Sequence, residues 1–319
     1  MNRNLILTLL VCILTTACQA QRTPLPTATF TSTYTAGQLI PTPRYNVPTA
    51  GRHTVTPEAT ATQHKMHTST PATASPPSTI TPDNSWMNLP VLPAPGENIR
   101  EIYETGLSLG NDPNAFSIFG DCQSEPDEFF GIYETDPLTL DSLTPELRET
   151  VAHFNGSFNR ASPTSQDGTT PGALLWDQWH RGEYGCTFSE TPVDCELRIH
   201  RPSFVIIQIG THFESRNTEY LRRIITQLIE NGVVPILATK ADNRELDHRI
   251  NRDMALLAAE FNLPLWNFWA ALSELPGRGL YVIDGREEQG AIYLNEEAQD
   301  IHRSTGLEAL DIVWRMATQ

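Results

Sequence analysis

The stretch FSIFGDCQ, residues 116–123, places a nucleophilic atom at the end of a short apolar run. The letters FSIF predict a strand, and the sequence Gly-Asp-Cys ends it. Cysteine attacks acyl carbon as its thiolate, so Cys122 needs a neighbouring base or dipole that lowers its pKa. Two other interpretations stay open. Cys122 is a small inert residue in a tight turn, or Ser124, two residues further on, supplies a displaced hydroxyl.

The elements that would position this cysteine alternate between strand and helix from residue 203 to 268. SFVIIQIG (203–210) is a near-continuous apolar run, typical of a strand buried on both faces. VVPILAT and LPLWNFW predict two more strands, and helices with apolar stripes are predicted between them in NTEYLRRIITQLIENG and RINRDMALLAAEFN. Such alternation favours parallel strands with crossover helices. We therefore expect an α/β fold, a three-layer α/β/α sandwich with a mainly parallel sheet.

Three segments outside this alternation also predict helices. ENIREIYETGLSLG is a helix or turn before the first strand, and STGLEALDIVWRMA is a C-terminal helix. TPELRETVAHF begins with Thr144 as N-cap and Pro145 at the first helical position, which is a favourable helix start.

Ligands of parallel sheets lie beyond the carboxyl ends of the strands, and this rule selects the residues to inspect. Asp121 and Cys122 follow the first strand, and His212 follows VIIQIG. His212 is a possible base for Cys122 or a hydrogen-bond donor to an oxyanion, against a histidine bonded within its loop. Lys240 and Asp242 follow VVPILAT and either line a pocket or belong to a solvated loop.

With these features the sequence resembles SGNH/GDSL hydrolases over roughly residues 114–316. The resemblance depends on strand-Gly-Asp-Cys, on VIIQIGTHF, and on ILATKADN with the helix and strand that follow it. It implies ester hydrolysis in which the residue after Gly-Asp attacks the carbonyl. Its backbone N–H, a glycine N–H and an Asn side chain would hold the oxyanion, and a late Asp-x-x-His would supply an orienting acid and a base.

Carried over residue by residue, the resemblance assigns the turn as follows. Asp121 is retained and shapes the turn, Cys122 replaces the nucleophilic serine, and His212 stands where the family has its oxyanion Asn. Gln123 and Ser124, next in the turn, are candidate substrate contacts.

The rest of the implied site departs further from the family. The late pair aligns best as Asp284 and Glu287, with Glu287 in the histidine position. His302 is the other candidate, but its position near the start of the last helix suggests a cap or surface group. The oxyanion glycine is Gly156, or its role falls to the segment that ends at Ser162. A Ser/His/Asp triad is not assigned.

The N-terminal residues predict export. Residues 1–17 have the basic, apolar and small-residue order of a signal peptide, and a lipobox-like Ala-Cys suggests lipidation of Cys18, against ordinary cleavage or an uncleaved anchor. Residues 18–85 are Thr/Pro-rich without periodicity and predict a disordered linker, which leaves residues 86–319 as one domain. We expect an extracytoplasmic protein, anchored in the cell membrane by its lipid.

Charge and cysteine usage limit the partners. Residues 1–82 carry +4, so the total of −16 leaves −20 for residues 83–319, which disfavours nucleic acid. Cys186 and Cys195 share a short loop and predict a disulfide, which leaves Cys122 as the odd thiol. No phosphate-loop or metal motif occurs, so neither a cofactor nor a metal is expected. The domain is expected to be a monomer.

Three functions remain open at this stage. The first is a membrane-tethered esterase acting on a small-molecule or glycan ester. The second is a catalytically inactive homologue that binds a carbohydrate or cell-surface ligand. The third is a surface spacer whose domain serves contacts only. The loss of the usual Ser, Asn and late His disfavours efficient catalysis, whereas a nucleophilic atom at position 122 favours some.

Overall fold

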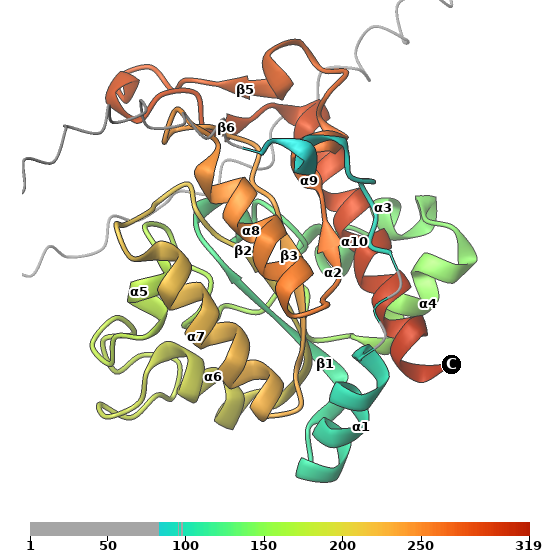
Figure 1. Ribbon diagram of the computed structural model, residues 1–319. Coiled ribbons are helices and arrows are strands. Elements are labelled where there is room, and N and C mark those ends of the chain that lie inside the picture. The colour runs from blue at the N-terminus through green and yellow to red at the C-terminus, as the bar shows by residue number, and fades with distance from the viewer. Residues whose placement is uncertain (1–82, 95, 97) are drawn as a thin grey trace, which may run out of the picture. The chain divides into compact units, whose positions relative to one another are not determined.

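The computed structural model describes residues 83–94, 96 and 98–319 (Figure 1). The predicted signal peptide, the predicted lipidation site at Cys18 and the predicted linker up to residue 82 lie outside the described residues. The described residues all fall in the compact unit Pro76–Gln319. Trp86, near the beginning of the described chain, is already buried.

Four parallel strands form the central sheet, and they are neighbours in chain order. They are β1 (Asp112–Gly120), β2 (Pro202–Gln208), β3 (Val234–Ala238) and β4 (Leu265–Trp266). Every residue of β2 and β3 is buried, as their continuous apolar runs predict. β4 is shorter than predicted because the side chain of Asn267 caps a helix that begins at Phe268.

Helices cover both faces of this sheet (Figure 1). α7 (Asn217–Glu230) and α8 (Arg249–Glu260) pack together on one side, and α1 (Ile99–Leu109), α4 (Pro145–His153) and α10 (Glu296–Thr318) pack together on the other. The α/β class and the three-layer sandwich are therefore confirmed.

The predicted start of α4 is confirmed, whereas α10 begins earlier than expected. Thr144 accepts a hydrogen bond from the N–H of Leu147, at 3.4 Å, as a helix N-cap does. Asn295 accepts one from Ala298 N–H at 2.9 Å, so α10 starts at Glu296.

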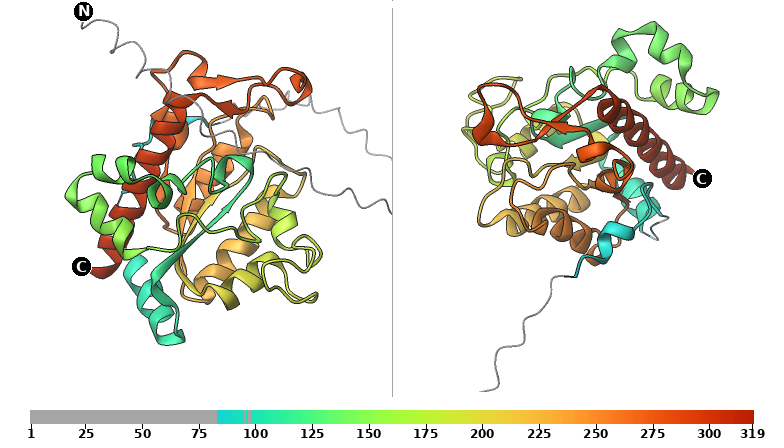
Figure 2. Two further views of the ribbon diagram at one scale, coloured as in Figure 1. Left: turned by 180° about the vertical axis from the view of Figure 1, so that it is seen from behind. Right: turned by 90° about the horizontal axis from the view of Figure 1, so that it is seen from above.

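Short elements complete the domain. The helices are α2 (Ile132–Thr135), α3 (Pro137–Ser142), α5 (Pro171–Leu174), α6 (Pro192–Ile199) and α9 (Phe268–Ala271), with 3-10 turns at Ser85–Asn88, Cys122–Ser124, Pro276–Gly279 and Glu287–Gln289. β5 (Leu280–Tyr281) pairs antiparallel with β6 (Tyr293–Leu294). Figures 1 and 2 show this β5–β6 segment over the end of the sheet at which β1 finishes.

The cysteines divide as predicted. Cys186 and Cys195 form a disulfide with a Cα–Cα distance of 5.3 Å, and Cys122 is the free cysteine of the described chain. Among the described residues, no helix has the length and apolar character that crossing a lipid bilayer requires.

Candidate functional site

The carboxyl ends of β1 and β2 lie side by side and are joined by one carboxylate. Gly120 pairs with Gln208 at the last position of the two strands. Asp121 follows Gly120, and its Oδ2 accepts hydrogen bonds from the N–H groups of Gly210 (3.2 Å) and Thr211 (3.0 Å). Asp121 is 3% exposed, so it acts as a buried clamp between the two strand ends.

Asp121 thereby holds the residues that follow β1 and β2 at the same edge of the sheet. Cys122 follows Asp121, and His212 follows Thr211. Both are partly exposed, whereas the residues before them are buried. The backbone therefore brings together the residues that follow these two strands, as expected for neighbouring parallel strands.

A third segment brings Asp167 to the same place. Gly120 donates its N–H to the carbonyl of Thr164 at 2.9 Å, so the loop that contains Thr164 runs along the outer edge of β1. The hydroxyl of Thr164 donates to Ile118 O at 2.8 Å. Three residues later, the N–H of Asp167 donates to the carboxylate of Glu125 at 2.6 Å.

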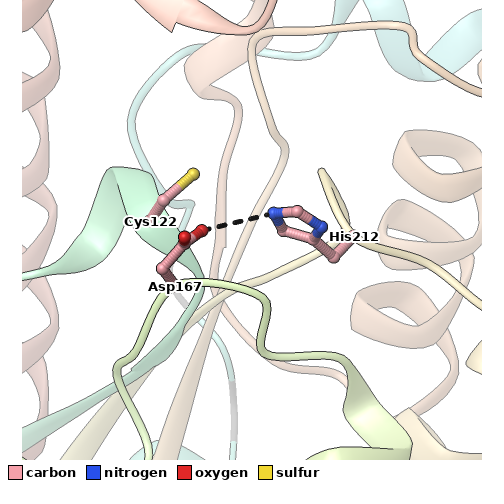
Figure 3. Close-up of side chains that lie close together, drawn as sticks. All are labelled: Cys122, Asp167 and His212. Atoms are coloured by element: carbon pink, nitrogen blue, oxygen red, sulfur yellow. Dashed lines mark ion pairs between the residues drawn. The ribbon is translucent and has the colours of Figure 1, made fainter. Parts of the chain in front are cut away.

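Cys122, Asp167 and His212 form the group that we call the Cys122 cluster (Figure 3). One ligand atom from each, the thiol sulfur, a carboxylate oxygen and an imidazole nitrogen, lie within 4.8 Å of one another. His212 Nε2 is 3.5 Å from Asp167 Oδ1. The side chain of His212 is 26% exposed and that of Asp167 is 72% exposed, so solvent reaches the cluster.

Two residues of the Cys122 cluster, Cys122 and Asp167, line a cavity of about 240 Å³, the Cys122 cavity. The thiol and Asp167 lie on one wall, and the β5–β6 segment supplies the other wall. Arg286 bridges that wall by donating to the hydroxyl of Tyr293 at 3.0 Å. The cavity is lined by Cys122, Gln123, Glu125, Glu128, Asp167, Tyr281, Ile283, Arg286, Tyr293, Leu294 and Gln299.

A wider hollow adjoins this cavity and shares Glu125 and Asp167 with it. It measures about 510 Å³, and we call it the Trp179 groove. Trp179, Arg181 and Tyr184 on its far side belong to the loop that leads into the disulfide. The groove therefore offers two aromatic side chains beside the Cys122 cluster.

The electrostatics of the cluster hold the thiol in its neutral form. Burial raises the pKa of Cys122 well above its usual range, and the negative charges of Asp121 and Asp167 raise it further. Burial, with the charge of Asp242, also raises the pKa of Asp121 to about 6, although the N–H groups that it accepts from and His212 act in the other direction. Thiolate at Cys122 is therefore scarce near neutral pH.

Two candidate substrate contacts follow Cys122 in the turn but differ in access. Gln123 lines the Cys122 cavity, and its amide donates to Ile292 O. Ser124 is fully buried, and its hydroxyl donates to the backbone carbonyl of Gln208 at 3.3 Å. The hydroxyl of Ser124 therefore does not reach the cavity.

Lys240 and Asp242 lie at the end of β3, but their side chains are turned into the protein. Lys240 Nζ forms ion pairs of 2.6 Å with Asp242 and with Glu245, and all three side chains are at most 3% exposed. Asp242 also accepts from the hydroxyl of Thr211 at 2.7 Å. These residues support the turn before His212 and do not line the Cys122 cavity.

The oxyanion candidates Gly156 and Ser162 have other partners. The N–H of Gly156 donates to Glu134 at 2.6 Å on an exposed loop. The hydroxyl of Ser162, which is buried, lies 2.7 Å from that of Thr164. Neither residue lines the Cys122 cavity.

The late acids Asp284 and Glu287 are exposed on the loop between β5 and β6. Glu287 accepts from the N–H of Gly285 at 2.9 Å. Their neighbours Ile283 and Arg286 line the cavity, whereas the two acids themselves do not.

The expectation that His302 caps or covers a helix end is wrong. His302 is fully buried in α10, and it stacks on Phe129 with a ring-centroid distance of 4.0 Å. Its Nε2 lies 2.6 Å from Gln208 Oε1, which can only accept, so Nε2 carries the proton. Burial lowers the pKa of His302 well below its usual range.

Sequence reasoning missed Asp167 and the wall formed by Tyr281, Arg286 and Tyr293. Asp167 lies in a polar loop whose composition predicts only a turn. Its one distinguishing feature is its position before Gly168, which takes a positive φ of 78°. The wall residues follow β4 in a segment without periodicity, so nothing local indicates that they fold back over β1.

Comparison with known proteins finds solved structures of similar arrangement at low sequence identity. No protein-family model matches the chain, and no curated protein matches its sequence. A protein described as lipolytic and of the G-D-S-L family, from Desulfitobacterium hafniense, is 14% identical, with a TM-score of 0.38 over 63% of this chain and 99% of that one. A GDSL-like lipase from Bacteroides thetaiotaomicron is 16% identical, with a TM-score of 0.39 over 67% and 98%. A catalytic mutant of an acetylxylan esterase from Geobacillus stearothermophilus is 15% identical, with a TM-score of 0.40 over 63% and 94%.

These proteins are ones to which the chain is similar in arrangement. At this level of similarity they assign no residue, so the site is defined by the geometry of the Cys122 cluster.

Proposed function

We propose that the domain is an ester hydrolase of SGNH/GDSL type in which the thiol of Cys122 is the nucleophile. The observation that carries the proposal is the meeting of Cys122, His212 and Asp167, whose ligand atoms all lie within 4.8 Å of one another, beside the cavity that Cys122 and Asp167 line. Three distant segments of the chain converge to bring together a nucleophile, a base and an acid, as nucleophilic catalysis requires.

Each residue of the cluster has a chemical role in this proposal. His212 takes the thiol proton as sulfur attacks the ester carbonyl, and the carboxylate of Asp167 beside the ring offsets the positive charge that His212 gains. The tetrahedral intermediate expels the alcohol, which receives the proton from His212. Water, deprotonated by His212, then cleaves the thioester, releases the acid and restores the thiol.

The proposed enzyme is slow on simple esters. The raised pKa of Cys122 leaves little thiolate, and the 3.5 Å contact between His212 and Asp167 is longer than a charge-assisted hydrogen bond of about 2.7–2.9 Å. Closure of substrate over the cluster would shorten this contact, as often happens when catalytic hydrogen bonds tighten in a complex.

The preferred substrate in this proposal is an ester carried on a saccharide. The Trp179 groove supports this because Trp179 and Tyr184 offer flat apolar faces for sugar rings beside the acyl site, and Asp127 and Asn159 offer polar contacts. A saccharide in the groove would present its acyl group to Cys122 across Glu125 and Asp167, which line both hollows.

The same proposal places the domain outside the cytoplasm, attached to the cell membrane through Cys18. The disulfide between Cys186 and Cys195 supports this location, since such bonds persist in oxidising compartments. The domain would act there as a monomer.

Hydrolysis of an activated acetyl ester tests the function. We expect weak hydrolysis by the wild type and none above the uncatalysed rate by Cys122→Ala. Cys122→Ser keeps the geometry and restores the nucleophile of the resemblance. Wild-type hydrolysis that Cys122→Ala leaves intact would overturn the role of the thiol.

An acetylated oligosaccharide tests the substrate class separately. Trp179→Ala should lower kcat/KM for this substrate while leaving hydrolysis of the small activated ester unchanged. Equal loss on both substrates would argue against a saccharide site in the groove.

A further inference from the structure

The Cys122 cluster combines three kinds of donor atom that a transition metal accepts. A thiolate sulfur, an imidazole nitrogen and a carboxylate oxygen are the ligands of zinc sites in proteins. We propose that Cys122, Asp167 and His212 form a binding site for a thiophilic divalent metal ion of the zinc class. The inference concerns binding, and it does not depend on whether the domain hydrolyses esters.

The distances suit such an ion after a small adjustment. Tetrahedral zinc, with bonds of about 2.0–2.3 Å, separates its ligand atoms by about 3.3–3.8 Å. His212 Nε2 and Asp167 Oδ1 are already 3.5 Å apart. All three ligand atoms lie within 4.8 Å of one another. The sulfur of Cys122 therefore needs to approach the other two by about 1 Å at most, which a side-chain rotation supplies.

The 3.5 Å contact is more typical of two ligands than of a bonded pair. Imidazolium and carboxylate that bind each other directly come to about 2.7–2.9 Å. In Figure 3 the carboxylate of Asp167 and the ring of His212 face each other, with the thiol of Cys122 nearby. An ion bound by all three residues would hold the carboxylate of Asp167 and the ring of His212 at about their present distance.

The charge around the cluster also favours a cation. Asp121, buried at 3% exposure, directly precedes Cys122, and Glu125 lies at the shared wall of the two hollows. The neighbouring cation Lys240 is already paired with two carboxylates inside the protein. Arg286, on the opposite wall of the Cys122 cavity, supplies the one opposing charge among its lining residues.

Hydrogen bonds fix the backbone at two of the three ligands before any ion binds. Asp121 fixes the turn before His212 by accepting from Thr211, and the N–H of Asp167 is held by Glu125. Such outer contacts orient metal ligands and limit the reorganisation that binding requires. Three protein ligands leave a fourth position, and the Cys122 cavity gives water access to it.

Metal binding would have a consequence for the thiol. A sulfur that is bound to zinc is no longer free to attack an acyl group or an alkylating reagent. The cluster would then exist in two states, a metal-free thiol state and a metal-bound state in which Cys122 is protected.

Titration of the full chain with Co²⁺, followed by competition with Zn²⁺, tests the site. We expect one Co²⁺ per chain, with the near-ultraviolet charge-transfer band of a cobalt–thiolate bond that Zn²⁺ removes. Cys122→Ser should abolish the band, whereas His212→Ala and Asp167→Asn should each weaken binding by at least about 10-fold. Glu288→Gln, which changes an exposed acid outside both hollows, is the matched control and should bind as the wild type does.

The same variants distinguish metal binding at the Cys122 cluster from metal binding at other sites of the chain. The chain also carries His53, His64 and His67, and Cys122→Ser keeps them all. Absence of a thiolate band in the wild type, or a band that survives in Cys122→Ser or in both His212→Ala and Asp167→Asn, would overturn the proposal.

Protection from alkylation gives a second measurement. Zn²⁺ should slow alkylation of Cys122 in the wild type but not in His212→Ala, and an equal rate with and without Zn²⁺ in the wild type would contradict the site. Circular dichroism should show the same helix content in every variant. Neither measurement uses an ester, so failure of the proposed hydrolase would leave both results interpretable.

Discussion

His212 and His302 lie near the same end of the sheet, yet their surroundings give them opposite properties. His212 follows β2, is 26% exposed and faces the carboxylate of Asp167. His302 comes from α10, is fully buried, and stacks on Phe129 beside Trp266. His302 bonds Gln208 Oε1, and Gln208 in turn is the neighbour of Ser124.

The difference shows that a histidine near the strand ends is not by itself a candidate base. Proton transfer to a substrate requires access to the cavity and a neutral ring that can gain a proton at moderate cost. His302 has neither, because burial penalises its charged form. His212 is accessible and has an acid at hand.

Replacement of the two histidines in turn gives the largest expected effect. His212→Ala should lower kcat/KM for an activated acetyl ester by about 10²–10⁴-fold, the range for loss of a general base. His302→Gln should change that rate little. Kinetics on both purified variants decide the matter, and a severe loss confined to His302→Gln would reverse the assignment.

The second largest effect is expected on stability, from loss of Asp121, the buried clamp between the ends of β1 and β2. Asp121→Ala leaves the buried N–H groups of Gly210 and Thr211 without their acceptor, at about 1–3 kcal/mol for each. We expect the free energy of unfolding to fall by about 2–4 kcal/mol in urea titrations. Asp121→Asn, which can still accept, is the control and should lose less. Equal stability of Asp121→Ala and wild type would show that the clamp is unnecessary.

The buried histidine should appear in the pH dependence of stability. The pKa of His302 is lowered in the folded protein, so the unfolded chain takes up a proton below about pH 6.5 that the folded chain refuses. The stability contributed by neutral His302 is present above pH 6.5 and is lost as the pH falls, by up to about 1.4 kcal/mol per pH unit.

The His302→Gln variant isolates this contribution. Urea titrations between pH 7 and pH 5 should show a shallower pH slope for His302→Gln than for the wild type. Identical slopes for wild type and His302→Gln would contradict the account of His302.

The sequence predicted the sheet and part of the site for identifiable reasons. The continuous apolar runs of β2 and β3 encode burial on both faces, and parallel strands bring their carboxyl ends together. That geometry is sufficient to place Cys122 near His212.

The remaining site residues depend on contacts between distant segments. Asp167 reaches the cluster because Thr164 pairs with Gly120 at the edge of β1, a contact that leaves no periodic pattern. Lys240 and Asp242 follow β3 as site residues would, but Glu245 completes an ion-pair network that turns them inward. The burial of His302 likewise requires aromatic rings from other segments, among them Phe129 and Trp266.

Trapping of an acyl intermediate tests the central claim, that Cys122 is the reactive atom of this domain. The wild type is mixed briefly with an activated acetyl ester, quenched in acid, digested and mapped by mass spectrometry. We predict an acetyl thioester on the peptide that contains Cys122, which neutral hydroxylamine removes. Unmodified Cys122 in a sample that is hydrolysing the ester, at a rate that Cys122→Ala retains, would contradict the account.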